Sequence, residues 1–74
     1  MTVTERYELR QRIADTLTAR MKKRHWTQQQ LASAADVPLT TVNDVLNART
    51  FPRIDTLCSL AKTLKLSLKT LCDQ

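Results

Sequence analysis

The sequence predicts an all-α protein in which five short helices surround one apolar centre. Apolar residues recur three or four positions apart along most of the chain, and helix start signals precede several of these periodic segments. Proline is limited to Pro38 and Pro52, and no repeat or low-complexity stretch interrupts the pattern. A chain of 74 residues can bury one small core, so we expect residues 1–74 to form a single domain.

The first helix is predicted over about residues 4–23. Its core stripe consists of apolar residues spaced every four positions: Leu9, Ile13, Leu17 and Met21. The last turn is rich in Lys and Arg, which suits the negative end of the helix dipole.

The second helix carries its own start signal. Thr27 and Gln30 form a capping box, and Trp26 with Leu31 brackets it as a hydrophobic staple. The helix is therefore expected to begin at Thr27. Its inner stripe has small side chains where a crossing helix can approach closely: Leu31, Ala32 and Ala35.

A tight break follows, in a chain that contains no glycine. Left-handed backbone at the two breaks of this region must therefore fall on other residue types. We expect Asp36 and Asn47 to adopt it, because Asp and Asn tolerate this conformation best after glycine, at roughly 1 kcal/mol. Pro38 holds Val37 extended and suits the start of a third helix at Pro38 or Leu39.

The third helix should have two distinct faces. Its inward face carries Val42, Val45 and Leu46 at positions i, i+3 and i+4. Residues 27–47 then form two short helices, the second leaning across the first, which is the construction of a helix-turn-helix. This motif makes double-stranded DNA the expected partner.

The outward face of the third helix carries short side chains suited to a major groove. Asn43 can bond bidentately to adenine, Leu39 can touch a thymine methyl group, and Asp44 can accept from cytosine. We predict five base-reading residues: Leu39, Thr40, Thr41, Asn43 and Asp44. Exposed Thr and Asn are also common as plain solvent-facing residues. For Asp44, a salt bridge to Arg49 worth about 0–1 kcal/mol is an equal alternative.

The rest of the chain supplies two more helices. One follows Pro52 and the irregular link over residues 48–53, with four core residues: Leu57, Leu60, Ala61 and Leu64. A fifth helix is predicted from Ser67, with Leu66 and Leu71 as its staple.

The chain resembles the lambda-repressor-like helix-turn-helix regulators, which include phage repressors, Cro proteins and small bacterial repressors. The resemblance covers nearly all of the chain and rests on Trp26, Thr27, Gln28, Leu31, Ala32, Val37, Val42, Asn47, Pro52, Leu57, Leu60, Ala61, Leu64, Leu68 and Leu71. It implies a compact five-helix DNA-binding domain whose Gln28 and Asn47 hold phosphates. The family usually has glycine where Asp36 stands, and often where Ala48 stands.

Charge is distributed unevenly along the chain. The net charge is +4 over residues 1–24, −2 over residues 25–47 and +3 over residues 48–74. Because phosphate neutralisation and counterion release supply most non-specific affinity, the flanks of the motif must hold the DNA backbone. The predicted phosphate contacts are Gln28, Asn47, Arg49, Arg53, Lys23 and Arg24. For Lys22, Lys23 and Arg24, stabilisation of the helix dipole is the alternative.

The remaining chemistry-bearing residues do not suggest catalysis. Cys58 and Cys72 are expected to be buried free thiols in a reducing compartment, with redox sensing through Cys72 as a minor alternative. Together with His25 they match no zinc spacing. The sequence has no glycine-rich phosphate loop, paired carboxylates or nucleophile with an evident base. We therefore expect no enzymatic activity, metal, cofactor or small-molecule ligand.

Location and assembly follow from similar arguments. No apolar run approaches the roughly 20 residues of a membrane span, and no secretory signal precedes the first helix, so a cytoplasmic location is expected. One recognition helix contacts few base pairs, so we predict a homodimer on a two-fold operator. The candidate interface residues are Phe51, Leu68, Leu71 and Cys72, with burial in the monomer core as the alternative.

The predicted function is a small repressor that occludes polymerase at its operator. A restriction-modification controller, which can also activate, is one alternative. Another is an antitoxin that binds DNA secondarily; antitoxins usually carry an additional toxin-binding segment, whereas this sequence ends at Gln74, soon after the predicted fifth helix. The sequence specifies neither the operator, the regulated genes nor the sign of regulation.

Overall fold

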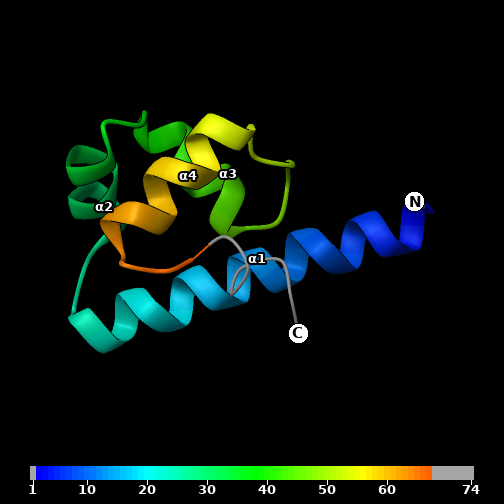
Figure 1. Cartoon of the computed structure of the whole chain (residues 1–74), viewed down its shortest axis with the longest axis horizontal. Coiled ribbons are helices and arrows are strands. Elements are labelled where there is room, and N and C mark those ends of the chain that lie inside the picture. Colours follow the sequence, from blue (N-terminus) through cyan, green and yellow to red (C-terminus); the bar gives the residue numbers. More distant parts are fainter. Residues whose placement is uncertain (1, 68–74) are drawn as a thin grey trace.

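A computed structural model describes residues 2–67 and confirms the all-α class. Within those residues it contains four helices and no strand: α1 (Val3–Arg24), α2 (Gln28–Ala35), α3 (Leu39–Leu46) and α4 (Ile54–Thr63) (Figure 1). This is one helix fewer than the five predicted. Ser67, where the fifth was expected to start, is not helical, and the rest of that segment lies outside the described residues.

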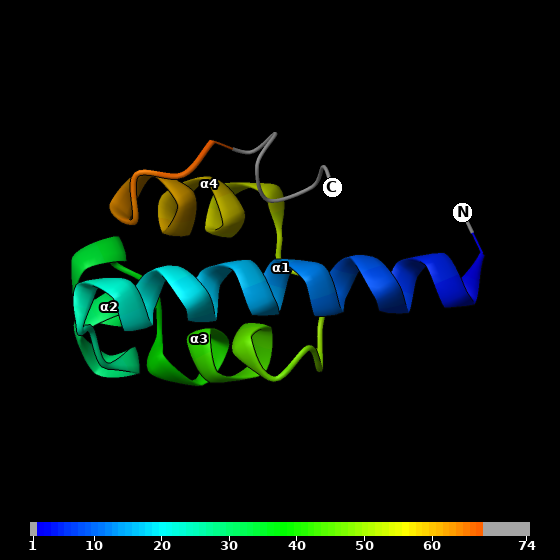
Figure 2. The ribbon, with the colours of Figure 1, turned by 90° about the horizontal axis from the view of Figure 1, so that it is seen from below.

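The long helix α1 forms one side of the molecule, and the three short helices gather along its C-terminal part (Figure 1). Seen from below, α3 and α4 flank α1 on opposite sides (Figure 2). α1 begins one residue earlier than predicted because Thr2 is its N-cap. The Thr2 hydroxyl accepts from the Glu5 amide at 3.1 Å, and the Thr2 amide donates to Glu5 Oε1 at 3.0 Å.

The predicted capping box of α2 is confirmed. The Thr27 amide donates to Gln30 Oε1 at 2.8 Å, and the Gln30 amide donates to the Thr27 hydroxyl at 3.1 Å. Trp26 is half-buried and packs against the core, as its role in a staple requires. The sequence alone therefore locates the start of α2 correctly.

Each of the four described helices ends in a left-handed residue that is not glycine, with φ of 57–58°: His25, Asp36, Ala48 and Lys65. In each case this residue and the next donate their amides back to the last turn, the Schellman arrangement. Three of the residues that follow them are apolar and pack against the core: Trp26, Val37 and Leu66. Helix ends thus gain hydrogen bonds and buried apolar surface, which offset the roughly 1 kcal/mol cost of each left-handed residue.

The expectation for the two breaks is half right. Asp36 is left-handed, with φ of 58° and ψ of 47°. Asn47 is not, since its φ is −95°, and Ala48 takes the left-handed conformation in its place. Ala48 is buried with 9% of its surface exposed, so a small side chain is what this position can accommodate.

The core confirms most of the predicted stripes. Ile13, Leu17 and Met21 of α1 are buried, and Leu9 is half-buried against them. All predicted core residues of α4 are also buried: Leu57, Leu60, Ala61 and Leu64. Within residues 2–67, no helix is long and apolar enough to pass through a bilayer.

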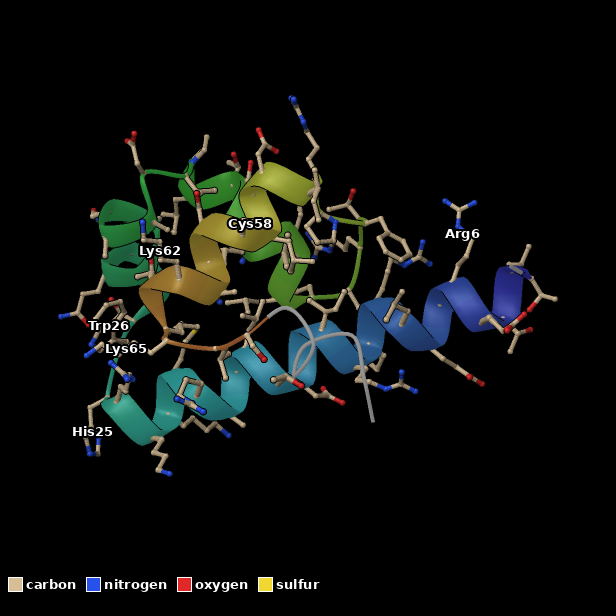
Figure 3. The ribbon with its side chains drawn as sticks, in the orientation of Figure 1. Arg6, His25, Trp26, Cys58, Lys62 and Lys65 are labelled. Atoms are coloured by element: carbon tan, nitrogen blue, oxygen red, sulfur yellow. The ribbon has the colours of Figure 1, made fainter. Side chains whose placement is uncertain are left out.

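The prediction of a buried Cys58 is wrong. Its side chain is exposed on α4 (Figure 3). The buried face of α4 runs through Leu57, Leu60 and Ala61, and position 58, about 100° round the helix from Leu57, lies beside that stripe rather than in it. Cys72 lies outside the described residues.

Candidate nucleic-acid interface

Helix α3 is held by the side that faces the domain. Val42 and Val45 are 0% and 1% exposed, while Leu39 on the other side is 46% exposed. α3 contacts both α1 and α2, and α2 in turn contacts α4. This packing fixes which side chains of α3 remain available to a partner.

Four of the five predicted base-reading residues share one groove between the start of α2 and the outer face of α3. The groove is lined by Thr27, Gln28, Gln29, Leu39, Thr40, Asn43, Asp44 and Arg49. Thr41 does not line it. Thr41 lines a separate depression between α3 and α4, together with Phe51 and Ser59.

A hydrogen bond joins the two helices of the motif within this groove. Asn43 Nδ2 donates to Gln28 Oε1 at 3.2 Å, and the pair is partly buried. It connects a predicted phosphate contact with a predicted base reader, 15 positions apart in the sequence. The bond restricts the rotamer of Asn43, so the amide that would meet a base edge is oriented before DNA arrives.

Asp44 forms an ion pair with Arg49, one of the two alternatives for this carboxylate. Arg49 NH1 lies 3.7 Å from Asp44 Oδ1, with side chains 67% and 46% exposed respectively. At this exposure the pair contributes about 0–1 kcal/mol. It does place a positive charge beside the only carboxylate of α3.

The side chain of Asn47 is engaged with its own helix. Asn47 Nδ2 donates to the Asn43 carbonyl at 2.8 Å and so helps to satisfy the end of α3. Asn47 borders a cleft where α1, α2 and α3 meet, together with Lys22, Trp26 and Gln28. Two of the predicted phosphate contacts, Gln28 and Asn47, are therefore neighbours in the fold.

Lys22 is the cation that shares this cleft, although it was not among the predicted contacts. Lys23 lines a different groove, with Asp15, Arg20 and Leu66. The helical period separates the two lysines by about 100° round α1. The sequence held no signal that separates them, because Thr18, one turn before Lys22, lines this cleft only once the helices are packed.

The other cations are dispersed. Arg53 Nε pairs with Asp55 Oδ1 at 3.5 Å, and both side chains are highly exposed. Arg24 is half-buried in the last turn of α1. Figure 3 shows His25, Lys62 and Lys65 at the same end of the molecule. That end, which α1 reaches with its C-terminus, is strongly basic.

Phe51, a predicted interface residue, is half-buried and packs against the core. The guanidinium carbon of Arg6 lies 5.9 Å from the centroid of its ring. Phe51 therefore contributes to packing within the monomer, and its role in a dimer interface stays a prediction. Leu68 and Leu71 lie outside the described residues. Among the residues that are described, no group of three or more His, Cys, Asp or Glu side chains could hold a metal ion.

Two short helices joined through a left-handed turn, the second exposing a polar face beside the start of the first, define a helix-turn-helix DNA-binding protein. The family model described as helix-turn-helix matches residues 17–71. The chain belongs to this family, that of the lambda-repressor-like, Cro/C1-type regulators. It is thus a DNA-binding transcriptional regulator, from a family that is typically non-enzymatic. Neither the curated proteins nor the solved structures that were compared contain a match.

Proposed function

We propose that the protein is a small dimeric repressor that reads a two-fold operator with the outer face of α3. The supporting observation is the groove that brings Leu39, Thr40, Asn43 and Asp44 together with Gln28. The four side chains from α3 include no cation, so they act through contacts with base edges rather than through attraction to phosphates.

Affinity in this proposal comes from residues around the groove. The proposed phosphate contacts are Gln28, Asn47, Arg24, Arg49 and Arg53, together with Lys22. Lys23, in its separate groove, adds to the positive field rather than to a direct contact. Thr41 is proposed to support the flank of the reading face. Because the partner is DNA, we propose that the protein acts in the cytoplasm, where it blocks access of polymerase to the operator.

The interaction of Asp44 with Arg49 suggests how one carboxylate is tolerated near DNA. The free protein neutralises Asp44 with Arg49 at 3.7 Å. When Arg49 turns to a phosphate, Asp44 is free to accept from a cytosine amino group, and bases that present only acceptors at that position are disfavoured. An Asp44→Asn variant should therefore change the preferred base at one position. Unchanged preference would contradict this role of Asp44.

Selection of bound sequences from a random DNA pool, followed by salt titration of the best binder, tests the proposal directly. We expect an enriched two-fold motif and affinity that falls steeply with salt. Arg49→Ala should weaken all sequences alike, whereas Asn43→Ala should weaken binding at particular bases. Failure to enrich any motif, with affinity insensitive to salt, would refute DNA reading by this face.

A further inference from the structure

The N-terminal turns of α1 project from the molecule. Residues 2–8 are all exposed, and Figures 1 and 2 both show this end of α1 extending past the three short helices. Val3 is 84% exposed and Tyr7 is 54% exposed. The two side chains are one helical turn apart, so they form a continuous apolar strip at this end of α1 rather than two scattered surface residues.

These side chains continue the buried stripe of α1. Ala14, Leu17 and Met21, at most 6% exposed, are buried in the domain. In the other direction the same alternation of three and four residues runs through Arg10, Tyr7 and Val3. This is the spacing by which one helix packs along another. The stripe is therefore covered by the domain in its second half and open to a partner in its first half.

We infer that the α1 seam, defined as Val3, Tyr7 and Arg10, docks on the same seam of a second copy of this chain. The two α1 helices would pair by their N-terminal turns across a two-fold axis, so the contact is isologous. The inference rests on the proposed function, binding to a two-fold operator, and it identifies the surface that joins the two subunits.

Charge favours this end of α1 over the other. The opposite end carries cations from α1 and from the end of α4: Lys22, Lys23, Arg24, Lys62 and Lys65. Figure 3 shows Lys62 and Lys65 there, and Arg6 at the far end. Two copies that met at the basic end would repel each other. The projecting turns together with the seam hold Glu5, Arg6, Glu8 and Arg10, two charges of each sign, so this end has no net charge and does not repel a second copy.

The length of α1 fits the spacing that DNA imposes. Recognition helices of a dimer lie about 34 Å apart on one face of the duplex, so each is about 17 Å from the two-fold axis. With a rise of about 1.5 Å per residue, Val3 lies about 21 Å along α1 from Leu17, which is buried in the core that supports α3. This length is enough for the projecting end of an α1 that runs toward the axis to reach it while α3 stays within its own half-site.

The test compares two full-length variants that carry the same added charge. Val3→Glu with Tyr7→Glu places two carboxylates in the seam. Thr4→Glu with Gln11→Glu places two about a quarter of a turn away on exposed positions. Glu is a good helix former and suits the first turns of a helix, so α1 should persist in both variants, as circular dichroism can verify.

Sedimentation equilibrium should show wild type and the Thr4/Gln11 variant as dimers, and the dimer dissociation constant of the Val3/Tyr7 variant raised at least about tenfold. On DNA, that variant should keep wild-type affinity for a half-site and lose cooperative binding to the full operator. Equal dimerisation by the two variants would overturn the inference, as would a wild type that is monomeric both free and on DNA. So would dimerisation abolished by Leu68→Glu with Leu71→Glu but not by the seam variant. If wild type selects no DNA motif, the proposed function fails while the dimer measurement still decides the role of the seam.

Discussion

Helices α2 and α3 have the same length, eight residues each, but are held in place by different means. α2 is fixed at both ends by local bonds, a capping box at Thr27 and a left-handed residue at Asp36. α3 starts after Pro38, and within the described residues no side chain caps its first turn. Its position depends instead on Val42 and Val45, which are buried against the rest of the domain.

The two helices can therefore divide their roles: α2 supports the motif, and α3 presents the side chains that are proposed to contact DNA. A helix fixed by its own ends does not need its neighbours in order to start and stop in the right place. A helix fixed from its buried side does not depend on its outer side chains to stay in place, so they can be exchanged with little loss of stability. The bond from Asn43 to Gln28 joins the two helices, since it uses the well-anchored α2 to orient one residue that is proposed to read a base.

The largest effect should come from weakening the buried side of α3. Val42→Ala removes two methyl groups from a fully buried site and should lower the free energy of unfolding by about 2 kcal/mol, through lost transfer energy and a cavity. Thr40→Ala, on the outer side, should change it by less than about 0.5 kcal/mol. Urea denaturation of both variants measures the difference. Equal losses would mean that α3 is not held from its buried side.

A second prediction concerns the link between the two helices. Asn43→Ala should cost roughly 1–3 kcal/mol of binding at one base pair of the operator, because that is the discrimination of a good bidentate contact. Gln28→Ala should cost part of the same energy, since it releases Asn43. In a double-mutant cycle on operator DNA the two losses should be non-additive. Additive losses would show that Gln28 does not orient Asn43.

The local anchoring of α2 can be removed by one substitution. Thr27→Ala deletes the acceptor for the Gln30 amide and should destabilise the protein by about 1 kcal/mol. Pro38→Ala, at the matching position before α3, removes no such bond and should cost less. Thermal denaturation distinguishes the two. A larger loss at Pro38 would reverse the comparison between the helices.

Left-handed helix ends offer a stabilising substitution. Ala48→Gly should stabilise the end of α3 by up to about 1 kcal/mol, because glycine adopts positive φ without strain. Ala34→Gly is its control, since Ala34 is exposed inside α2 and the same change there should destabilise by roughly 1 kcal/mol. Changes in the free energy of unfolding of opposite sign, measured by chemical denaturation, would support a strained left-handed backbone at Ala48. A loss at both positions would argue against a strained Ala48.

The smallest effect is a difference between the two capping boxes. The Glu5 carboxylate accepts a hydrogen bond from the Thr2 amide and interacts with the Thr2 side chain, and these two contacts, in that order, lower the pKa of Glu5 below its ordinary value. The stabilisation of the helix start by ionised Glu5 is therefore fully present above the ordinary pKa of Glu. It is lost as pH falls through the lowered pKa of Glu5 in the folded protein. Over that range the protection factors of amides at the start of α1, which correct for the slower intrinsic exchange at low pH, should fall, while those at the start of α2, capped by neutral Gln30, should not change. Glu5→Gln should remove the pH dependence.

Local signals in the sequence predicted what local chemistry controls. The Thr27 capping box, the turn at Asp36 and the core stripe of α4 all depend on residues within one or two helical turns, and the structure confirms them. The Thr2 cap was available by the same rule, since Glu5 follows it at the capping-box spacing. A predicted start near Thr4 overlooks this cap.

Other errors fall where distant parts of the chain meet. Asn47 has the better intrinsic preference for left-handed backbone, but Ala48, which is buried, adopts it. The choice between Lys22 and Lys23 depends on which side of α1 faces α2 and α3, and no single-helix pattern gives that orientation. The partner of Asn43 is 15 residues away and becomes visible only when α2 and α3 are packed.

The sequence by itself determined the helical class, the motif over residues 27–47, the inward stripes and the acidic charge of the reading segment, because periodicity, caps and charge are properties of neighbouring residues. Tertiary structure alone decided the groove that unites Gln28 with α3, the cleft that contains Lys22, and the projection of Val3 and Tyr7 beyond the core. These features depend on how helices cross. Crossing is set by the packing of whole buried faces, which no local pattern specifies.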